Sequence, residues 1–269
     1  MKNALTIFTF VLFALSPPAQ AKYNQVSYQA VTLLEAPKPD NVLRYSDSEL
    51  QFIEHWQSPS QNKRNVVFVH GGCWLSAYDI AHSRAVTGAI RDEGFEVFSI
   101  EYRRAGDPDG GWPNSLTDIN SAVTYLSEQG YIEPQNTVIM GHSAGGHLAI
   151  LSAIAKPKLF NAIVGLAAIT DIKKYAKGSN GCQRATTSFM QGTPEEKPQD
   201  YQEANPVDNE IPINTWLMYA DRDTIVPDTH ASAVKQERRV LIKDGGHFDF
   251  VHPNTVAFEQ MMLLLNTLY

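Results

Sequence analysis

The chain has 269 residues and a formal net charge of −7, with 22 Lys and Arg against 29 Asp and Glu. Its basic residues form no cluster, so the sequence lacks the electrostatic signature of a protein that binds nucleic acid or an anionic membrane surface. The eight histidines and two cysteines include no H-E-x-x-H or C-x-x-C spacing, which argues against a metal site. No exposed apolar stripe stands out that would indicate an oligomer.

The first 21 residues have the pattern of a secretory signal peptide. Lys2 supplies the positive charge, Ala4–Leu15 is an apolar core, and Ala19–Ala21 reads A-Q-A, a small-residue cleavage site. An uncleaved anchor is the alternative, but 12 helical residues span about 18 Å, against about 30 Å for a bilayer core. The first cysteine is Cys73, so none follows the cleavage site to carry a lipid. We therefore expect a mature chain beginning at Lys22, periplasmic or secreted, with no stable membrane insertion.

Residues 22–269 read as a single α/β domain, because short apolar runs alternate with amphipathic segments. The expected strands are Asn65–His70, Phe95–Tyr102, Thr137–Gly141, Ala162–Ile169, Thr215–Ala220 and Arg239–Asp244, with Val26–Leu34 and Leu50–Trp56 as antiparallel edge strands. The expected helices are Ile80–Glu93, Ser115–Gln129, Ala144–Ala155, Thr229–Gln236 and Asn254–Leu268. The polar interval Asp171–Pro206, rich in Gly, Pro and Gln, interrupts the alternation after a strand, where a cap insertion would cover a site.

Residues 141–146 read G-H-S-A-G-G and place Ser143 in a G-x-S-x-G element. A β-branched run precedes it and a helix-forming stretch follows. This strand–turn–helix context is typical of a nucleophile elbow, in which a sharp turn exposes the serine hydroxyl above the sheet. The helix that follows also directs free N–H groups at any negative charge that forms nearby.

Two further residues complete a catalytic triad in the expected chain order. Asp223 follows the strand Thr215–Ala220, and His247 follows the strand Arg239–Asp244. Both lie at the carboxyl ends of strands, the edge where open α/β sheets place their sites. A serine hydroxyl is a poor nucleophile until an imidazole takes its proton, so we assign His247 as the base and Asp223 as the residue that orients it.

Three other residues compete for these roles. Asp221 is the alternative acid, but it lies closer to the end of the strand. His142 and His147 are alternative bases, but both lie within the elbow and its helix, where reaching the serine Oγ is awkward. We interpret both histidines as packing residues.

The segment His70–Trp74, H-G-G-C-W, directly follows an apolar strand and is a candidate oxyanion loop. Acyl transfer creates an oxyanion that needs preorganised N–H donors. We assign these donors to the backbone of Gly72, Cys73 and Ala144. The alternative is an ordinary Gly-Gly turn.

Five motifs together resemble the α/β-hydrolase superfamily, in its esterase and lipase branch. They are HGGCW at 70–74, EYRR at 101–104, GHSAGG at 141–146, DRDTIVP at 221–227 and GGHFD at 245–249. The resemblance implies a mostly parallel central sheet with helices on both faces, a small cap insertion and a Ser-Asp-His triad. The HGG-x-W form is similar to arylformamidases, and GHSAGG and GGHFD resemble peptidase-related and feruloyl-esterase-like members. Hormone-sensitive-lipase relatives carry a third glycine after HGG, which this chain lacks.

Other residues have structural as well as functional interpretations. Trp74 and Trp112 either line the substrate pocket or pack in the core. Arg103 and Asp118 are expected to form an internal ion pair rather than to touch substrate, and Asp79 is expected at a solvated helix start.

Cys73 and Cys182 are the only cysteines, so one intramolecular pairing is available. Export permits a disulfide. Since the two residues lie on the oxyanion loop and in the cap interval, we expect the bond to pin the cap over the site.

The sequence thus predicts an exported serine hydrolase that cleaves carboxylic esters through an acyl-enzyme and needs no cofactor. Amide or formamide hydrolysis, as in an arylformamidase or a small-peptide hydrolase, is the first alternative because the same triad serves it. A non-catalytic binding module on a hydrolase scaffold is the second. The expected partner is a small ester or amide molecule.

Overall fold

The computed structural model describes residues 24–60 and 63–269, so the expected signal peptide lies outside the described residues. An eight-stranded sheet forms the centre of the fold, in the order β1-β2-β4-β3-β5-β6-β7-β8. The strands are β1 Asn41–Arg44, β2 Phe52–Trp56, β3 Asn65–Val69, β4 Glu96–Ile100, β5 Thr137–His142, β6 Ala162–Leu166, β7 Thr215–Ala220 and β8 Arg239–Ile242. Strand β2 pairs antiparallel with β1 and β4, and all other neighbours pair parallel.

The central strands are buried on both faces, as a parallel sheet covered by helices requires. Every residue of strands β3, β5 and β6 is buried. The six expected parallel-sheet strands are confirmed, although several end earlier than expected. Strand β6 stops at Leu166 rather than at Ile169, because Ala167 turns the backbone to φ 46° and an extended strand cannot continue through positive φ.

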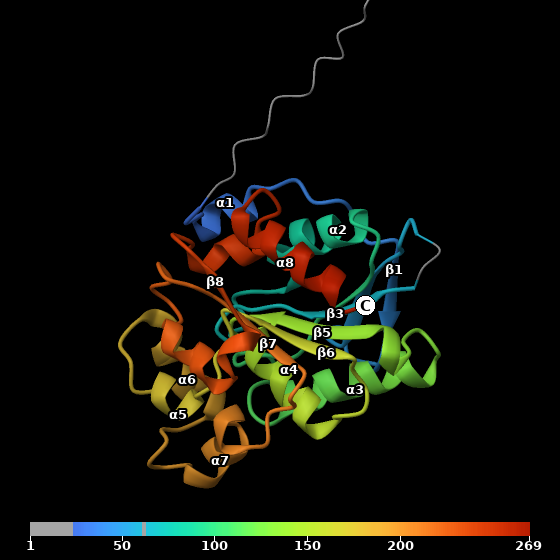
Figure 1. Ribbon diagram of the computed structural model, residues 1–269. Coiled ribbons are helices and arrows are strands. Elements are labelled where there is room, and N and C mark those ends of the chain that lie inside the picture. Colours follow the sequence, from blue (N-terminus) through green and yellow to red (C-terminus); the bar gives the residue numbers. More distant parts are fainter. Residues whose placement is uncertain (1–23, 61–62) are drawn as a thin grey trace, which may run out of the picture.

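Helices cover both faces of the sheet (Figure 1). The α-helices are α1 Tyr28–Thr32, α2 Arg84–Asp92, α3 Asn114–Glu128, α4 Ala144–Ala155, α5 Ile172–Tyr175, α6 Gly181–Met190, α7 Pro198–Glu203 and α8 Val256–Thr267. Short 3-10 segments are η1 Ile80–Ser83, η2 Pro134–Asn136, η3 Pro206–Asp208, η4 Asp228–Ala233, η5 Gln236–Arg238 and η6 His247–Val251. Apolar side chains of α1, α2 and α8 share one core cluster with the sheet, while those of α3 to α7 share another. With one of these clusters on each face of the sheet, the fold has three layers: helices, sheet and helices.

The prediction of an edge strand at Val26–Leu34 is wrong. This segment contains helix α1, which begins after Ser27, whose hydroxyl accepts a hydrogen bond from the Ala30 N–H. The antiparallel edge position next to β2 is occupied instead by β1. Val31 is the buried residue of this helix, while Ala30 is half-buried and Thr32 is exposed.

The expected helix Thr229–Gln236 is also wrong in type. It is replaced by η4 and η5, because Val234 between them is extended (φ −118°, ψ 164°) and breaks the helical backbone. The expected helix Ile80–Glu93 begins as the 3-10 turn η1 before α2. Asp79 caps η1 by accepting from the Ala81 N–H at 3.0 Å, which confirms its interpretation as a helix start.

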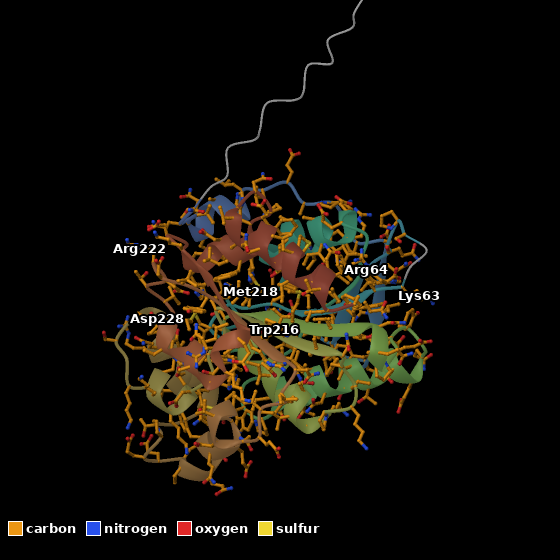
Figure 2. The ribbon with its side chains drawn as sticks, in the orientation of Figure 1. Lys63, Arg64, Trp216, Met218, Arg222 and Asp228 are labelled. Carbon is orange, nitrogen blue, oxygen red and sulfur yellow. A yellow bond between two sulfur atoms is a disulfide. The ribbon has the colours of Figure 1, made fainter. Side chains whose placement is uncertain are left out.

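The parallel strands all point their carboxyl ends to the same edge of the sheet. Figure 2 shows the two sides of the molecule, with Lys63 and Arg64 before β3 on one side, and Arg222 and Asp228 after β7 on the other. The loops that carry the candidate site residues leave this second, carboxyl edge. Within residues 24–60 and 63–269, no helix is long and apolar enough to cross a bilayer.

Candidate active site

Ser143 lies between β5 and α4 in a backbone conformation that most residues avoid, with φ 55° and ψ −118°. Its own N–H donates to the Leu166 carbonyl at 2.8 Å, which fixes the turn against β6. The turn needs glycine at Gly145, because a Cβ there would lie 2.2 Å from the Val69 carbonyl oxygen of β3. This geometry is that of a nucleophile elbow, in which a strained serine stands at the amino end of a helix.

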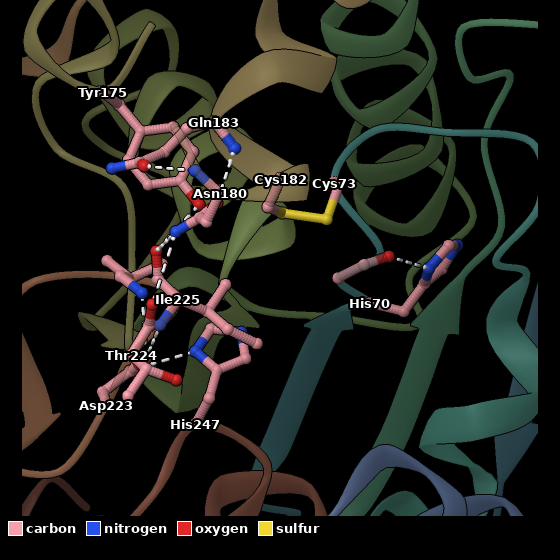
Figure 3. The surroundings of a disulfide bond; sticks show 12 residues. His70, Cys73, Tyr175, Asn180, Cys182, Gln183, Asp223, Thr224, Ile225 and His247 are labelled. Carbon is pink, nitrogen blue, oxygen red and sulfur yellow. Dashed lines mark hydrogen bonds and ion pairs between the residues drawn. A yellow bond between two sulfur atoms is a disulfide. The ribbon is translucent and has the colours of Figure 1, made fainter. Parts of the chain in front are cut away.

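His247 and Asp223 are joined by a hydrogen bond of 2.7 Å from Nδ1 to Oδ2 (Figure 3). The second oxygen of Asp223 accepts the N–H groups of Ile225 and Val226, at 2.8 and 2.9 Å. Both side chains of the pair are almost fully buried. The carboxylate is therefore held by its own loop, with one oxygen free to orient the imidazole. The alternative acid, Asp221, is exposed.

Ser143 and His247 line the same cavity, which has a volume of about 380 Å³. The cavity is lined by Tyr28, Gly72, Cys73, Leu75, Tyr78, His82, His142, Ser143, Asn180, Gly181, Cys182, Ile225, His247 and Phe248. The serine, the imidazole and the expected oxyanion loop thus face one space, large enough for a small organic molecule.

The two alternative bases make structural contacts. His142 Nε2 lies 2.9 Å from the His247 carbonyl oxygen, and His147 Nε2 lies 2.7 Å from the Ala204 carbonyl oxygen. Burial lowers the pKa of both rings, that of His147 to about 4, and His247 lowers the pKa of His142 further. Both rings are therefore neutral near pH 7 and donate from Nε2. His142 supports the backbone of His247, a role that sequence reasoning did not identify.

The expected oxyanion loop turns sharply through three consecutive residues with positive φ, at 107° for Gly72, 53° for Cys73 and 57° for Trp74. Gly72 also packs too closely for any side chain, because a Cβ there would lie 2.4 Å from the Tyr78 Cβ. Within the described part of the chain, the N–H groups of Gly72 and Cys73 donate no backbone hydrogen bond. The Ala144 N–H is in the first turn of α4, where helix N–H groups have no intrahelical acceptor.

The side chain of His70 links this loop to Glu101. Its Nε2 lies 2.9 Å from Glu101 Oε1, and its Nδ1 lies 2.8 Å from the Gly71 carbonyl oxygen. The ring is thus held at both nitrogens, between the Glu101 carboxylate and the backbone of its own loop. Burial alone would raise the pKa of Glu101, but His70 and Arg104 outweigh burial and lower it. The EYRR motif thus holds the HGG motif in place.

The disulfide between Cys73 and Cys182 is present, as the sequence predicted, with Cα atoms 5.1 Å apart (Figure 3). It joins the oxyanion loop to α6, in the interval expected to form a cap. Asn180 adds a second link, because its side-chain amide donates to the Ile225 carbonyl at 2.9 Å. The cap segment is therefore fastened both to the oxyanion loop and to the loop of Asp223.

Replacing Cys182 with serine should lower the free energy of unfolding by about 2–4 kcal/mol, because the bond closes a long loop in the unfolded chain. Urea unfolding of the variant and of the oxidised wild-type protein, without reducing agent, would measure the loss. Ser188→Ala is the matched control, since Ser188 is exposed on the same helix. Equal midpoints for the two variants would contradict a stabilising role for the bond.

Both tryptophans lie outside the set of side chains that line the cavity. Trp74 is fully buried and stacks on Phe189, with ring centroids 4.8 Å apart, and Trp112 packs edge-on against the same ring. Of the two interpretations of these tryptophans, the structure favours packing in the core over a place in the lining of this cavity. The expected ion pair of Arg103 and Asp118 is confirmed at 2.7 Å.

Several cavity residues were not identified from the sequence: Tyr28, Leu75, Tyr78, His82, Asn180, Gly181, Ile225 and Phe248. Phe248 and Ile225 were within reach of sequence reasoning, because each is within two residues of a proposed triad member. Leu75 directly follows the H-G-G-C-W segment, and the other five come from segments in which no motif was identified. Among the described residues, no cluster of three or more His, Cys, Asp or Glu could hold a metal ion.

The buried histidines predict that the protein loses stability in acid. Burial lowers the pKa of His82, His147 and His230 from 6.5 to about 4, with a further contribution from His70 at His82. The unfolded chain therefore takes up these protons first as the pH falls. The contribution of the neutral rings to the free energy of unfolding is therefore complete above about pH 6.5. It is lost towards pH 4, by up to about 1.4 kcal/mol per pH unit for each ring.

His147→Gln tests this expectation, because glutamine keeps a donor for the Ala204 carbonyl but does not titrate. Urea unfolding at several pH values between 6.5 and 4.5 would compare the two proteins, and all other titrations cancel in the difference. As the pH falls, the free energy of unfolding should decrease more steeply for the wild-type protein than for the variant. The difference in slope should approach that of one proton, about 1.4 kcal/mol per pH unit. If the free energy of unfolding fell equally with pH in both proteins, His147 would not contribute to the loss of stability in acid.

The comparisons with known proteins agree with this fold. The BD-FAE family model matches residues 55–237. A kynurenine formamidase of Meyerozyma guilliermondii is 28% identical over 81% of this chain and 83% of its own length. Esterase LipC of Mycobacterium tuberculosis is also 28% identical, but over 41% of this chain and 28% of its own length.

Solved structures show the same fold. Esterase B of Lactobacillus rhamnosus superposes with a TM-score of 0.72 at 17% identity, covering 90% of this chain and 89% of that one. An arylesterase superposes with a TM-score of 0.70 at 16% identity, over 90% and 89% of the two chains. Since the family match spans well over half of the sequence, the chain belongs to the BD-FAE family, within the α/β-hydrolase superfamily.

Proposed function

We propose that this chain is an exported serine hydrolase that cleaves carboxylic esters through an acyl-enzyme, with Ser143, Asp223 and His247 as its triad. The observation that carries the proposal is the 2.7 Å contact between His247 and Asp223 at the wall of the cavity that Ser143 also lines. Membership of an esterase group within the superfamily supports the reaction class.

The proposed mechanism follows from the positions of these groups. Ser143 Oγ attacks the ester carbonyl carbon while His247 Nε2 takes its proton, and Asp223 stabilises the imidazolium that forms. The N–H groups of Gly72, Cys73 and Ala144 hold the negative oxygen of the tetrahedral intermediate. His247 returns its proton to the leaving alcohol. A water molecule then attacks the acyl carbon while His247 takes a proton from it, and the acyl–Oγ bond breaks as His247 returns that proton to Ser143, which releases the acid.

Export is supported by the signal-peptide pattern of residues 1–21 and by the disulfide, since structural disulfides persist mainly in oxidising compartments. We place the mature protein in the periplasm or outside the cell. Residues 171–206, with α5, α6 and α7, act as its cap-like insertion.

A fluorophosphonate probe provides a direct test of the triad, because it labels only an activated serine. The purified mature chain should gain one probe molecule, on the peptide containing Ser143, and His247→Ala should remove the labelling. No labelling of the wild-type protein would favour a non-catalytic binding module.

Amide or formamide hydrolysis remains the second candidate, favoured by the similarity to a kynurenine formamidase over most of both chains. Comparing kcat/KM for p-nitrophenyl butyrate, aminoacyl-naphthylamides and N-formylkynurenine separates the two. We expect the ester to be the best substrate, and a higher kcat/KM for N-formylkynurenine would reverse the assignment.

A further inference from the structure

The N-terminal segment of the described chain forms one wall of the cavity. Tyr28 of α1 lines the cavity, and its ring lies 5.5 Å from that of Tyr78 and 5.5 Å from that of Phe248, centroid to centroid. Tyr78 follows the oxyanion loop, and Phe248 follows His247 directly. Tyr28 therefore bridges the two halves of the proposed machinery, although it lies more than 100 residues from Ser143 in the chain.

A buried carboxylate fastens this segment to the loop of His247. Asp249, which is fully buried, accepts the N–H groups of Gln25 and Val26, both at 2.8 Å. The same carboxylate accepts the Gly246 N–H at 3.0 Å, immediately before His247. The contact is close, because a Cβ on Gly246 would lie 2.9 Å from the Gln25 Cα.

Helix α1 depends on this attachment. It has five residues, and an isolated helix of that length does not form in water. Val31, which is buried in the core, the partly buried Val26 and the ring contacts of Tyr28 also hold the segment. Loss of the carboxylate would remove the two hydrogen bonds that fix the backbone at its start.

We propose that Tyr28 is a specificity-determining residue that limits the bulk of the ester the cavity accepts, and that Asp249 is the positioning residue that holds it there. The inference rests on the proposed hydrolase function. The tyrosine ring packs against Tyr78 and Phe248 and lines the same cavity as His247. A smaller side chain at this position enlarges the cavity where substrate lies, and a larger one reduces it.

Substitutions of opposite size at Tyr28 test the first half of the proposal. For p-nitrophenyl esters from acetate to octanoate, the ratio of kcat/KM for octanoate to that for acetate should rise about 10-fold in Tyr28→Ala, and it should fall in Tyr28→Trp. Tyr125→Ala is the control, because Tyr125 is a half-buried tyrosine of α3 outside the cavity. An unchanged ratio in both Tyr28 variants would overturn the proposal.

A double-mutant comparison tests the role of Asp249. Asp249→Asn should shift the octanoate-to-acetate ratio in the same direction as Tyr28→Ala, and the double variant should shift it no further than Tyr28→Ala alone. Hydrogen exchange of residues 25–32 should speed up in Asp249→Asn. Fully additive shifts, or a lower rate for all esters with an unchanged ratio, would leave Asp249 a purely structural residue and overturn its assigned role.

The outcomes separate this inference from the proposed function. If Ser143→Ala hydrolyses the esters as fast as the wild-type protein does, the function is wrong and the inference falls with it. If Ser143→Ala is inactive while the Tyr28 variants keep the wild-type ratio, only the inference is wrong. Should Asp249→Asn fail to fold, the two Tyr28 variants still decide the question, since that ring is only half-buried.

Discussion

Replacing Ser143 with alanine is expected to abolish ester hydrolysis, lowering kcat by about 10⁶-fold if the chemical step limits turnover. The substitution removes one oxygen atom and with it the nucleophile. The elbow itself should persist, because alanine carries the same Cβ through the turn at φ 55°, and the N–H that bonds the Leu166 carbonyl is unchanged. Initial rates with p-nitrophenyl acetate and butyrate, together with circular dichroism, would separate lost chemistry from lost folding.

The matched control is Ser152→Ala, nine positions further along the same α4 helix. Ser152 is fully buried, and its hydroxyl has no hydrogen-bond partner among the described residues, so its removal should leave activity near the wild-type level. Turnover by Ser143→Ala within tenfold of the wild-type rate would mean that another residue is the nucleophile. Loss of activity in both variants would point to damage to α4 instead.

The core of the fold could be predicted from local pattern because burial dictates it. Strand β7 and helix α4 begin and end at the expected residues. Strands that are buried on both faces appear in the sequence as short continuous runs of β-branched or apolar residues, and their length and β-branched content distinguish them from buried helices. Their ends were harder to place, because single residues decide them. Ala167, for example, ends β6 because its φ is positive, and the residue type alanine does not indicate such a conformation.

The grouping of Ser143, Asp223 and His247 near one cavity was predictable for a topological reason. Parallel strands deliver their following loops to the same edge, so three residues that each follow a strand meet there. The disulfide followed from similar reasoning, since Cys73 and Cys182 were assigned to loops at that edge. The individual side-chain contacts within these loops could not be predicted in this way, because topology gives only the edge at which the loops meet.

The N-terminal segment shows where sequence reasoning fails. Val26–Leu34 has apolar residues at spacings that fit a strand or a helix, and local pattern could not decide between them. The carboxylate of Asp249, more than 220 positions away in the chain, helps to fix the backbone of this segment by accepting two N–H groups at its start. A contact at that sequence separation leaves no local signal, and so the cavity wall formed by Tyr28 was missed.

Replacing Asp223 with asparagine should lower kcat/KM by about 10⁴-fold while leaving the loop intact. The amide oxygen can still accept the N–H groups of Ile225 and Val226, as Oδ1 now does. The amide nitrogen would then face His247 Nδ1 and donate to it, whereas the carboxylate accepts. That reversal places the imidazole proton on Nε2, so the ring can no longer take the proton of Ser143. Activity should be lost without a matching loss of stability.

Asp221→Asn is the natural control for this prediction, because Asp221 lies two residues away on the same loop and is exposed. Its substitution should change kcat/KM less than tenfold. Steady-state rates with p-nitrophenyl butyrate and urea midpoints for both variants would make the comparison. If Asp221→Asn were the more damaging change, the acid of the triad would have to be reassigned. If neither variant lost activity, orientation by a carboxylate would not be part of the mechanism, and the 2.7 Å contact with His247 would be structural only.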